Sequence, residues 1–375
     1  MTLFFIFAMS SYFILLIAFY VGWKRTFSPS VGNSGEENKS ISIVIPYRNE
    51  AEAIPILLDS LRRLDYPDNK LEVIWVNDHS EDGSETLLKK MVGENGLFKL
   101  LALSAGVYGK KQAITLGVQQ ATGEVIAITD ADCKVPRLWL KRINQAFGQE
   151  DVKLVFGGVR MEDGQSFFSR LQAMEFAGLV GSAVSTLGLG FFSMCNGANL
   201  AFLKSAFTAV DGYEGNMQIP SGDDEFLGRK IAQAYPRPIR FLAFADAVVT
   251  TRPLPTGYDF MQQRIRWAGK WKYNQSAATR FLAFSVFVSQ LAFVGLAGAA
   301  LLGGIGWIQA LALWGIKIIL EAVYLTSVGR FLNSTWRWAL FAVLQFIYPL
   351  YVLTTVVLSQ TGAYHWKGRK LSHKI

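Results

Sequence analysis

Residues 109–132 read GKKQAITLGVQQATGEVIAITDAD, and this stretch decides the fold. It opens with a helical pattern over Lys110–Gln120. A β-branched apolar run, Val125–Thr129, follows and leads into two aspartates, Asp130 and Asp132. A helix that leads into a strand with apolar residues on both faces is typical of a βαβ unit. Polar residues directly after such a strand lie where open parallel sheets bind ligands. The stretch therefore predicts a parallel sheet with a functional site at its carboxyl edge.

The sequence before this stretch repeats the same alternation. It predicts strands over Ile41–Pro46, Leu71–Asn77 and Lys99–Leu103, with helices over Glu50–Leu64 and Ser84–Val92. Strands that alternate with helices indicate an α/β fold with a mostly parallel sheet. No G-x-G-x-x-G follows the first strand and no G-x-x-x-x-G-K-[ST] occurs in the chain, which argues against dinucleotide binding and P-loop hydrolysis.

The chain also carries a membrane signature. Of its 375 residues 51% are hydrophobic, and the mean hydropathy is +0.25 although 18% of residues are charged. Leu3–Val21 contains no charged residue, and Lys24 and Arg25 follow it. In a signal peptide basic residues precede the apolar run, so we expect an uncleaved transmembrane anchor whose C-terminal end lies in the cytosol.

The last third of the chain contains three more apolar runs, Phe281–Leu302, Ile305–Val328 and Trp338–Leu358. Each is long enough to span a bilayer. The middle run contains Lys317 and Glu321, which share one helix face and should face protein or a polar cavity, as a structural pair or a functional one. A further apolar stretch, at residues 177–202, is expected to be buried core or a membrane-contacting segment.

Counting these spans produces a conflict. One helix at the N-terminus and three at the C-terminus place the basic tail, with Lys367, Arg369, Lys370 and Lys374, on the side away from Lys24 and Arg25. That arrangement contradicts the positive-inside bias. Either this chain does not follow the positive-inside bias, or one apolar run lies in the membrane interface.

The predicted organisation follows from these patterns. It comprises a transmembrane anchor (1–23), a linker (24–40), an α/β domain (41–255), an interfacial amphipathic helix (256–280), transmembrane helices (281–358) and a basic tail (359–375). Two cysteines cannot frame a disulfide scaffold, and the three histidines have no metal-ligand spacing. The net charge of +8 is spread over the membrane-proximal ends, which argues against a nucleic-acid partner.

Several polar positions have both a chemical and a structural interpretation. Asp130 and Asp132 suit a divalent cation, Mg²⁺ or Mn²⁺, but a DxD can be an acidic turn. Asp78 precedes a helix and could simply cap it. The acids of Ser221–Glu225 could serve only a helix dipole. Gln263, Arg266 and Trp267 share one face of a helix rich in basic and aromatic residues, which is also typical of an interfacial helix.

The order of these motifs resembles membrane-bound inverting glycosyltransferases of family 2, which have the GT-A nucleotide-sugar fold. The matching segments are VIPYRNE (Val44–Glu50), VNDHSEDGS (Val76–Ser84), the 109–132 stretch, NGANLAF (Asn196–Phe202), SGDDEFLGRK (Ser221–Lys230) and QRIRW (Gln263–Trp267). Thr115, Asn77 and Asp223 depart from the residues usual in these motifs. The tail WKGRK (Trp366–Lys370) is similar to that of ceramide glucosyltransferase-like members.

The resemblance implies a role for each motif. Asp224 would be the catalytic base, with Asp223 as the alternative. Asp78 would hold the uracil or ribose of the donor, Lys110 would neutralise a phosphate, Asp132 would bind the cation, and Asp130 would contact the ribose or the cation. The donor pocket wall would comprise Pro46, Tyr47, Arg48 and Glu50. The acceptor and diphosphate region would comprise Asn196, Gly197, Asp223, Gln263, Arg266 and Trp267.

The expected activity is transfer of a sugar, with inversion, from a nucleotide-sugar to a lipid acceptor at the cytosolic face of the membrane. We expect a UDP-sugar as donor and the bacterial inner (plasma) membrane as the location. The alternatives are a processive polysaccharide synthase, of the beta-linked glucan or poly-N-acetylglucosamine type, and a non-catalytic nucleotide-binding membrane protein.

Overall fold

The computed structural model describes residues 2–27, 38–93, 96–148, 151–273, 276–360 and 363–372. The chain forms two compact units. The helical unit comprises Met1–Phe27, Asp163–Ser193 and Pro253–Ile375, and the sheet unit comprises Ser28–Glu162 and Met194–Arg252. The domain expected at 41–255 differs from this division in two segments, because residues 163–193 and 253–255 group with the helical unit. Most of the expected 24–40 linker and the last residues of the tail lie outside the described residues.

A seven-stranded sheet organises the sheet unit, in the order β3-β2-β1-β4-β8-β6-β9. Its strands are β1 (Ile41–Tyr47), β2 (Leu71–Asn77), β3 (Phe98–Ala102), β4 (Val125–Ile128), β6 (Leu154–Gly157), β8 (Leu200–Leu203) and β9 (Ile239–Leu242). Strands β1 to β4 pair in parallel, as do β6 and β9, whereas β8 runs antiparallel to both β4 and β6. The predicted mostly parallel sheet is confirmed.

Helices and a small second sheet complete the sheet unit. The helices are α2 (Ile54–Arg62), α3 (Ser84–Val92), α4 (Lys110–Gln120), α5 (Trp139–Ala146), α7 (Lys204–Ala209) and α8 (Asp223–Ala234). The small sheet pairs β5 (Cys133–Lys134), β10 (Val249–Thr251) and β7 (Val159–Met161). Short 3₁₀ turns lie at Asp68–Lys70, Gly197–Asn199 and Ala245–Ala247. Helix α2 begins four residues later than the predicted Glu50, because a turn precedes it and Pro55 fits only in a first helical turn.

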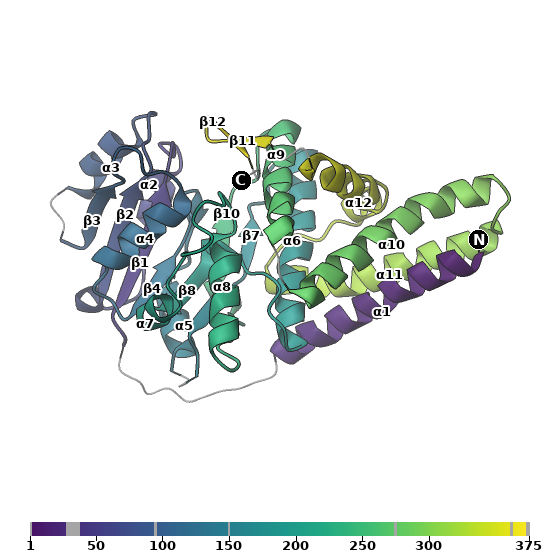
Figure 1. Ribbon diagram of the computed structural model, residues 1–375, viewed down its shortest axis with the longest axis horizontal. Coiled ribbons are helices and arrows are strands. Elements are labelled where there is room, and N and C mark those ends of the chain that lie inside the picture. Colours follow the sequence, from purple (N-terminus) through teal and green to yellow (C-terminus); the bar gives the residue numbers. More distant parts are fainter. Residues whose placement is uncertain are drawn as a thin grey trace. The chain divides into compact units, whose positions relative to one another are not determined.

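Close packing of α4 on β1 positions the carboxyl edge. The side chains of Ile43, Val44 and Ile45 are fully buried. A Cβ atom at Gly117 of α4 would lie only 2.4 Å from Val44 Cγ1, so the helix packs directly on the strand. This contact places the N-terminus of α4, where Lys110 lies, at the edge where β1, β2 and β4 end (Figure 1).

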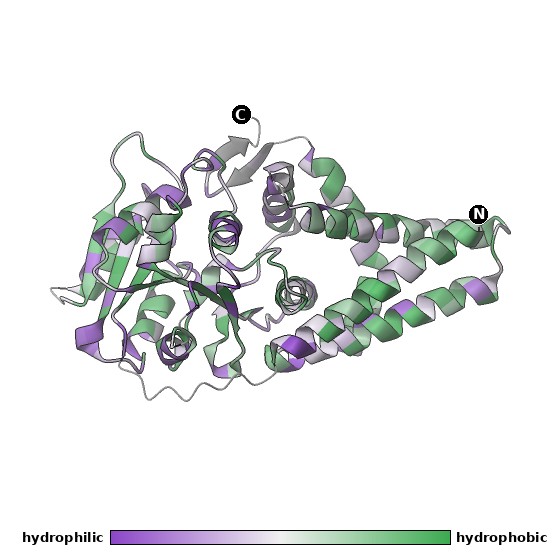
Figure 2. Cartoon of the chain, turned by 60° about the horizontal axis from the view of Figure 1, so that its bottom comes forward, coloured by the Kyte–Doolittle hydropathy of each residue, from purple (hydrophilic) through white to green (hydrophobic). Residues whose placement is uncertain are grey.

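Long apolar helices build the helical unit (Figure 1). Its helices are α1 (Thr2–Thr26), α6 (Phe167–Gly188), α9 (Gly257–Gly269), α10 (Ala277–Leu301), α11 (Trp307–Phe331) and α12 (Trp338–Ser359), with a 3₁₀ turn at Lys270–Tyr273 and a hairpin of β11 (Ala363–Trp366) and β12 (Arg369–Ser372). Among the described residues, α1, α10, α11 and α12 are long and apolar enough to cross a membrane. Figure 2 shows hydrophobic residues along most of their lengths.

Glycines allow α6 to cross α1 at very short range. A Cβ atom at Gly188 would lie 1.9 Å from the carbonyl oxygen of Gly22, and one at Gly22 would lie 2.2 Å from the carbonyl oxygen of Ser185. The apolar stretch at 177–202 therefore splits between the two units. Its first part completes α6, and its last part forms β8 in the core of the main sheet.

Candidate active site

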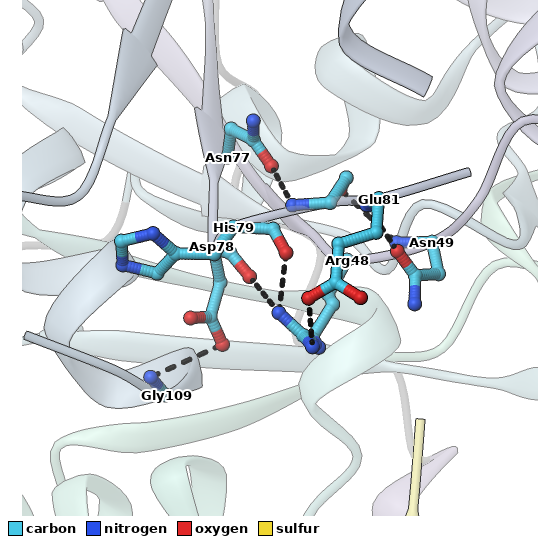
Figure 3. A network of polar contacts seen from close by, with 8 residues as sticks. Arg48, Asn49, Asn77, Asp78, His79, Glu81 and Gly109 are labelled. Carbon is cyan, nitrogen blue, oxygen red and sulfur yellow. Dashed lines mark hydrogen bonds and ion pairs between the residues drawn. The ribbon is translucent and has the colours of Figure 1, made fainter. Parts of the chain in front are cut away.

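The loops after β1 and β2 are joined by a network of hydrogen bonds at the carboxyl edge of the sheet (Figure 3). Arg48 is 7% exposed, and its Nη1 donates to the carbonyl oxygens of Asp78, at 2.8 Å, and of His79. The backbone N–H of Glu81 donates to Asn49 Oδ1 at 2.8 Å. Asn49 and His79 both adopt positive φ, at 52° and 56°, which is uncommon for residues other than glycine. The network holds both strand ends in one fixed arrangement.

Asp78 lies at the centre of this edge and is 2% exposed. Its backbone N–H donates to the carbonyl oxygen of Tyr47 at 2.8 Å. Its Oδ2 accepts a hydrogen bond from the backbone N–H of Gly109 at 3.1 Å. Gly109 has a φ of 105°, a conformation that favours glycine. The glycine of the 109–132 stretch thus connects the β2 end to the start of α4.

Lys110 is the charged centre of the site. Its Nζ lies 2.7 Å from Asp130 Oδ1 and 3.0 Å from Asp223 Oδ2. Burial alone would lower the pKa of Lys110, but Asp130 and Asp223 outweigh it and raise the pKa well above its usual value. Burial would raise the pKa of Asp223, and Lys110 reverses this and lowers it. The lysine is therefore a permanent cation between the two carboxylates.

Asp224 lies beside this cluster at the first turn of α8. Its Oδ2 accepts a hydrogen bond from the backbone N–H of Gly197 at 3.0 Å, and its Oδ1 accepts one from the backbone N–H of Glu225 at 2.7 Å. A Cβ atom at Gly197 would lie 3.2 Å from both Asp223 Oδ2 and Lys110 Nζ. That spacing is tighter than most Cβ contacts, so Gly197 lets the charged groups approach closely, and its N–H orients the carboxylate of Asp224.

The two aspartates after β4 offer oxygen donors of the kind that Mg²⁺ and Mn²⁺ prefer. Asp132 Oδ1 accepts a weak hydrogen bond from Cys133 Sγ at 3.6 Å. Burial raises the pKa of the Cys133 thiol, and the charges of Asp132 and Asp130 add to this, so the thiol remains protonated. Within the described ranges, no three His, Cys, Asp or Glu residues form a ready-made metal cluster. Such a donor pair fits a cation that takes its other ligands from a diphosphate and water, as Mg²⁺ commonly does.

Of the other residues expected in the donor pocket wall, Pro46 and Tyr47 are buried, whereas Glu50 is partly exposed. Pro46 and Tyr47 are buried within β1, and the Tyr47 ring packs edge-on against Trp75 with centroids 6.0 Å apart. The backbone N–H of Glu50 donates to Ser84 Oγ at 2.8 Å. Pro46 and Tyr47 therefore support the carboxyl edge from beneath, while Glu50 lies partly exposed at its rim.

Gln263, Arg266 and Trp267 lie in the helical unit, on α9, and all three are partly exposed. The residue between them, Arg264, is 3% exposed and forms an ion pair with Glu175 of α6. Its guanidinium also lies over the Trp267 ring at 4.3 Å and donates to Gln263 Oε1. The interfacial helix expected over 256–280 is shorter, because α9 ends at Gly269, a 3₁₀ turn follows, and α10 already begins at Ala277.

Sequence reasoning did not identify two of the buried charges near these motifs. Lys111 is 4% exposed, donates to the carbonyl oxygen of Asn216 at 2.7 Å, and contributes to the lowered pKa of Asp223. The sequence signal that could have identified Lys111 is the pair of consecutive lysines after Gly109. Glu175, the partner of Arg264, had no local signal, because a single acid in an apolar helix does not indicate which cation it meets.

Two family profiles match the chain. The sequence profile of Glycosyl transferase family group 2 matches residues 125–358, more than half of the chain. The chain belongs to this glycosyltransferase family. The profile of Glycosyl transferase family 2 matches residues 42–207. The chain is thus a membrane-associated family 2 glycosyltransferase, as the motif order predicted.

Individual relatives of this glycosyltransferase match over part of their length. The undecaprenyl-phosphate 4-deoxy-4-formamido-L-arabinose transferase of Pectobacterium atrosepticum is 31% identical over 140 residues, which cover 36% of this chain and 41% of that protein. The poly-beta-1,6-N-acetyl-D-glucosamine synthase of Staphylococcus epidermidis is 28% identical over 215 residues, 56% of this chain and 51% of that protein. The chain thus spans about half, or less, of the length of these relatives.

A solved structure extends the similarity to almost the whole chain. The mannosyltransferase PcManGT from Pyrobaculum calidifontis, in complex with GDP-Man and Mn²⁺, superposes with a TM-score of 0.63 at 21% sequence identity. The superposition covers 91% of this chain and 97% of that protein. At this level of identity the similarity concerns the fold, and it confirms the predicted GT-A architecture of the glycosyltransferase.

Proposed function

We propose that this glycosyltransferase transfers one sugar, with inversion, from a nucleotide-sugar to a lipid acceptor at the cytosolic face of the bacterial inner membrane. The observation that carries the proposal is the cluster at the carboxyl edge of the sheet. Asp224 is oriented by the N–H of Gly197 at 3.0 Å, beside Lys110 in its ion pairs with Asp130 and Asp223. A base next to a fixed positive charge is what displacement of a diphosphate requires.

On the donor side, we assign Asp78 to the base or ribose of the nucleotide. Its carboxylate is fixed by the N–H of Gly109, and the Arg48 network fixes the loop around it. A rigid carboxylate can select ribose hydroxyls or the uracil N–H without paying an ordering cost on binding. UDP-sugars are the expected donors, and GDP-mannose belongs in any panel because the mannosyltransferase with the same fold was solved with it.

Lys110 and the DxD aspartates would act on the diphosphate. Asp132 and Asp130 would hold a divalent cation, which offsets the negative charge that develops on the leaving group. Lys110 adds a cation of its own at the N-terminus of α4, where the helix dipole also favours anions. As the diphosphate arrives, Lys110 can exchange an aspartate partner for a phosphate oxygen, because Asp130 is 38% exposed.

Asp224 would act as the general base. The acceptor hydroxyl attacks the anomeric carbon, its proton passes to the carboxylate of Asp224, and the bond from that carbon to the diphosphate oxygen breaks. One base and one displacement give inversion. Asp223 is less suited to this role, because its carboxylate is 11% exposed and is held by Lys110 at 3.0 Å.

The acceptor is the point on which lipid transfer and polymer synthesis differ. The relative named as an undecaprenyl-phosphate transferase supports a lipid acceptor, and the relative named as a poly-N-acetylglucosamine synthase supports a polymer. We favour the lipid, because three C-terminal apolar helices in one chain leave little protein from which to build a polymer channel.

Product analysis tests the proposal. The purified full-length chain would receive Mg²⁺ or Mn²⁺, radiolabelled UDP-sugars or GDP-mannose, and a membrane lipid extract. We expect label in the organic phase as a single-sugar lipid. A ladder of long polymer would replace the lipid proposal with the synthase. If no nucleoside diphosphate is released from any donor, the chain is a nucleotide-binding protein only.

The base assignment has its own variant. Asp224→Asn keeps the shape of the side chain and one of its two acceptor oxygens but removes its basicity, so transfer should fall by about 10² to 10⁴-fold while donor binding is retained. Glu214→Gln is the matched control, because it changes an exposed carboxylate of the same unit to an amide. Unchanged turnover in Asp224→Asn would move the base to Asp223.

A further inference from the structure

The three longest helices of the helical unit define a common axis. Tyr12 of α1 contacts Phe293 of α10, with ring centroids 5.7 Å apart, and a Cβ atom at Gly295 would lie 3.4 Å from the Phe5 ring. Residue numbers rise along α10 as they fall along α1, so these helices are antiparallel. Helix α11 runs parallel to α1, because Trp23 at the C-terminal end of α1 contacts Phe331 with centroids 5.8 Å apart. One end of this three-helix bundle therefore contains Lys24, the C-terminus of α11 and the N-terminus of α10. We call it the basic end.

Helix α12 starts from the basic end. Phe331 is the last residue of α11, and six residues connect it to Trp338. The first turns of α12 pack beside α6 and α11, where Leu340 and Phe341 join Met174 and Ala322 in one buried cluster.

The segment after α12 also lies at the basic end. Strand β11 packs against α9, and Arg266 of α9 acts electrostatically on the buried Tyr364 of β11. Helix α9 is separated from the N-terminus of α10 by only seven residues, so it belongs to the basic end as well.

The second half of α12 contacts the elements of this same end. The Tyr351 hydroxyl donates to Glu175 Oε1 of α6 at 3.2 Å, and its ring lies 5.5 Å from Phe260 of α9. In Figures 1 and 2 alike, α12 extends only part of the way along α1, α10 and α11 toward the N-terminus of α1. With 22 residues it is long enough to span, yet the segments before and after it both contact elements of the basic end.

We propose that α12 does not cross the membrane. It enters one leaflet from the basic end and returns to the same side, with its exposed apolar side chains against the acyl chains of that leaflet. These side chains are Trp338, Phe346, Leu350 and Val357, each more than half exposed. A helix satisfies its own backbone hydrogen bonds, so it can lie obliquely in lipid without crossing.

The charge distribution supports this topology independently of the packing. With three crossing helices, the basic end gathers Lys24, Arg25, Arg330, Arg337, Lys367 and Arg369 on one side of the membrane. The connection between α10 and α11 at the opposite end, residues 302–306, contains no lysine or arginine. The positive-inside bias, which a fourth crossing helix would violate at the tail, is then obeyed throughout.

Cysteine labelling tests the side of the tail. The only native cysteines, Cys133 and Cys195, are buried and would be replaced by alanine. Single reporters at Arg25→Cys, Leu302→Cys and Ser372→Cys would be exposed to a membrane-impermeant maleimide in sealed vesicles, before and after permeabilisation. Arg25→Cys and Leu302→Cys mark the two sides, whatever the orientation of the vesicles.

We expect Ser372→Cys to label together with Arg25→Cys and opposite to Leu302→Cys. Labelling of Ser372→Cys together with Leu302→Cys would overturn the proposal and make α12 a fourth span. A C-terminal epitope on the unsubstituted chain, digested by protease in the same vesicles, gives a second readout that does not depend on the substitutions.

Discussion

Lys110 in the sheet unit and Lys317 in the helical unit make similar ion pairs in different surroundings. Lys317 is 3% exposed, and its Nζ donates to Glu321 Oε2 at 2.9 Å and to Gln345 Oε1 at 2.6 Å. Lys110 bridges Asp130 and Asp223, but its side chain is 23% exposed and that of Asp130 is 38% exposed. One lysine is enclosed by protein groups, whereas the other borders solvent.

The enclosed network draws on three helices near mid-length. Gln345 Nε2 of α12 donates to Glu321 Oε2 at 2.9 Å, and the Tyr12 hydroxyl of α1 donates to Glu321 Oε1 at 2.6 Å. Each strong donor is used inside the protein, so the network can fasten helices together within lipid but has little left to offer a ligand. The comparison shows that buried charge alone does not make a binding site. A structural ion pair has its polar groups paired within the protein, whereas a binding site leaves some of them accessible to a ligand.

Breaking the enclosed pair should have the largest effect. Lys317→Met leaves Glu321 as a buried charge without its cation, and we expect a loss of about 3–5 kcal/mol in the free energy of unfolding. Thermal unfolding of the full chain in lipid nanodiscs would measure it. The double variant Lys317→Met/Glu321→Gln should recover most of the loss, because no charge then remains. A single variant as stable as the wild type would mean that the pair does not fasten the helices.

The sheet unit also contains a buried carboxylate with several hydrogen-bond partners away from the site, that of Glu72. Its carboxylate, on a residue 8% exposed, accepts hydrogen bonds from Ser42, Lys99 and Thr122. Burial would raise the pKa of Glu72, but these bonds outweigh it and lower the pKa from 4.5 to about 2. The folded state therefore gains stability above pH 4.5 and loses it as the pH falls from 4.5 toward 2, with at most about 3 kcal/mol at stake.

Glu72→Gln removes this contribution, so the variant should be less stable than the wild type at pH 7. The difference should shrink on acidification below pH 4.5. Unfolding measured by intrinsic fluorescence between pH 7 and pH 3 would follow it. Glu52→Gln, at an exposed position, is the control and should run parallel to the wild type. A difference that grows with acidification would contradict the sign of the pKa shift.

At the open site the same kind of substitution should affect turnover more than stability. Lys110→Met removes the cation between Asp130 and Asp223, and we expect kcat/KM to fall about 10²-fold, or ~2.7 kcal/mol. The unfolding midpoint should shift less than in Lys317→Met, because Asp130 can be hydrated and Lys111 still offsets the charge of the more buried Asp223. Lys141→Met, which breaks a surface pair with Asp65, is the control for loss of a lysine. A large loss of stability with normal turnover would place Lys110 among the closed networks.

Elements whose periodicity and end signals lie within their own segment could be predicted from the sequence. The strand Leu71–Asn77 and the helices Ser84–Val92 and Lys110–Gln120 have the predicted bounds, because their periodicity and end signals lie within each segment. The motif order also singled out Asp130 and Asp223, both of which pair with Lys110 in the structure.

Features that depend on partners distant in sequence could not be predicted in this way. The pairing of Arg264 with Glu175 requires the packing of α9 against α6, which no local pattern encodes. The course of α12 is a similar case. Its hydropathy predicts a span, and the contacts with Glu175 and Phe260 that support the course proposed above come from elements far away in the sequence.

The smallest change, a single methyl group, probes how closely the open site is packed. Gly197→Ala would place a Cβ atom 3.2 Å from Lys110 Nζ and from Asp223 Oδ2, closer than most such contacts, while leaving the backbone N–H that orients Asp224. The flexible lysine can shift by a few tenths of an ångström, so we expect about a tenfold loss of kcat/KM, or ~1.4 kcal/mol, with little change in stability. Gly96→Ala, whose added methyl group meets nothing within 4 Å, is the control for the substitution.

Because the methyl group at Gly197 removes no charge and no hydrogen-bond donor, a loss confined to Gly197→Ala would show that turnover depends on the spacing of these groups. Full activity in that variant would mean that the lysine and aspartates tolerate displacement, as expected of groups that rearrange around an arriving diphosphate.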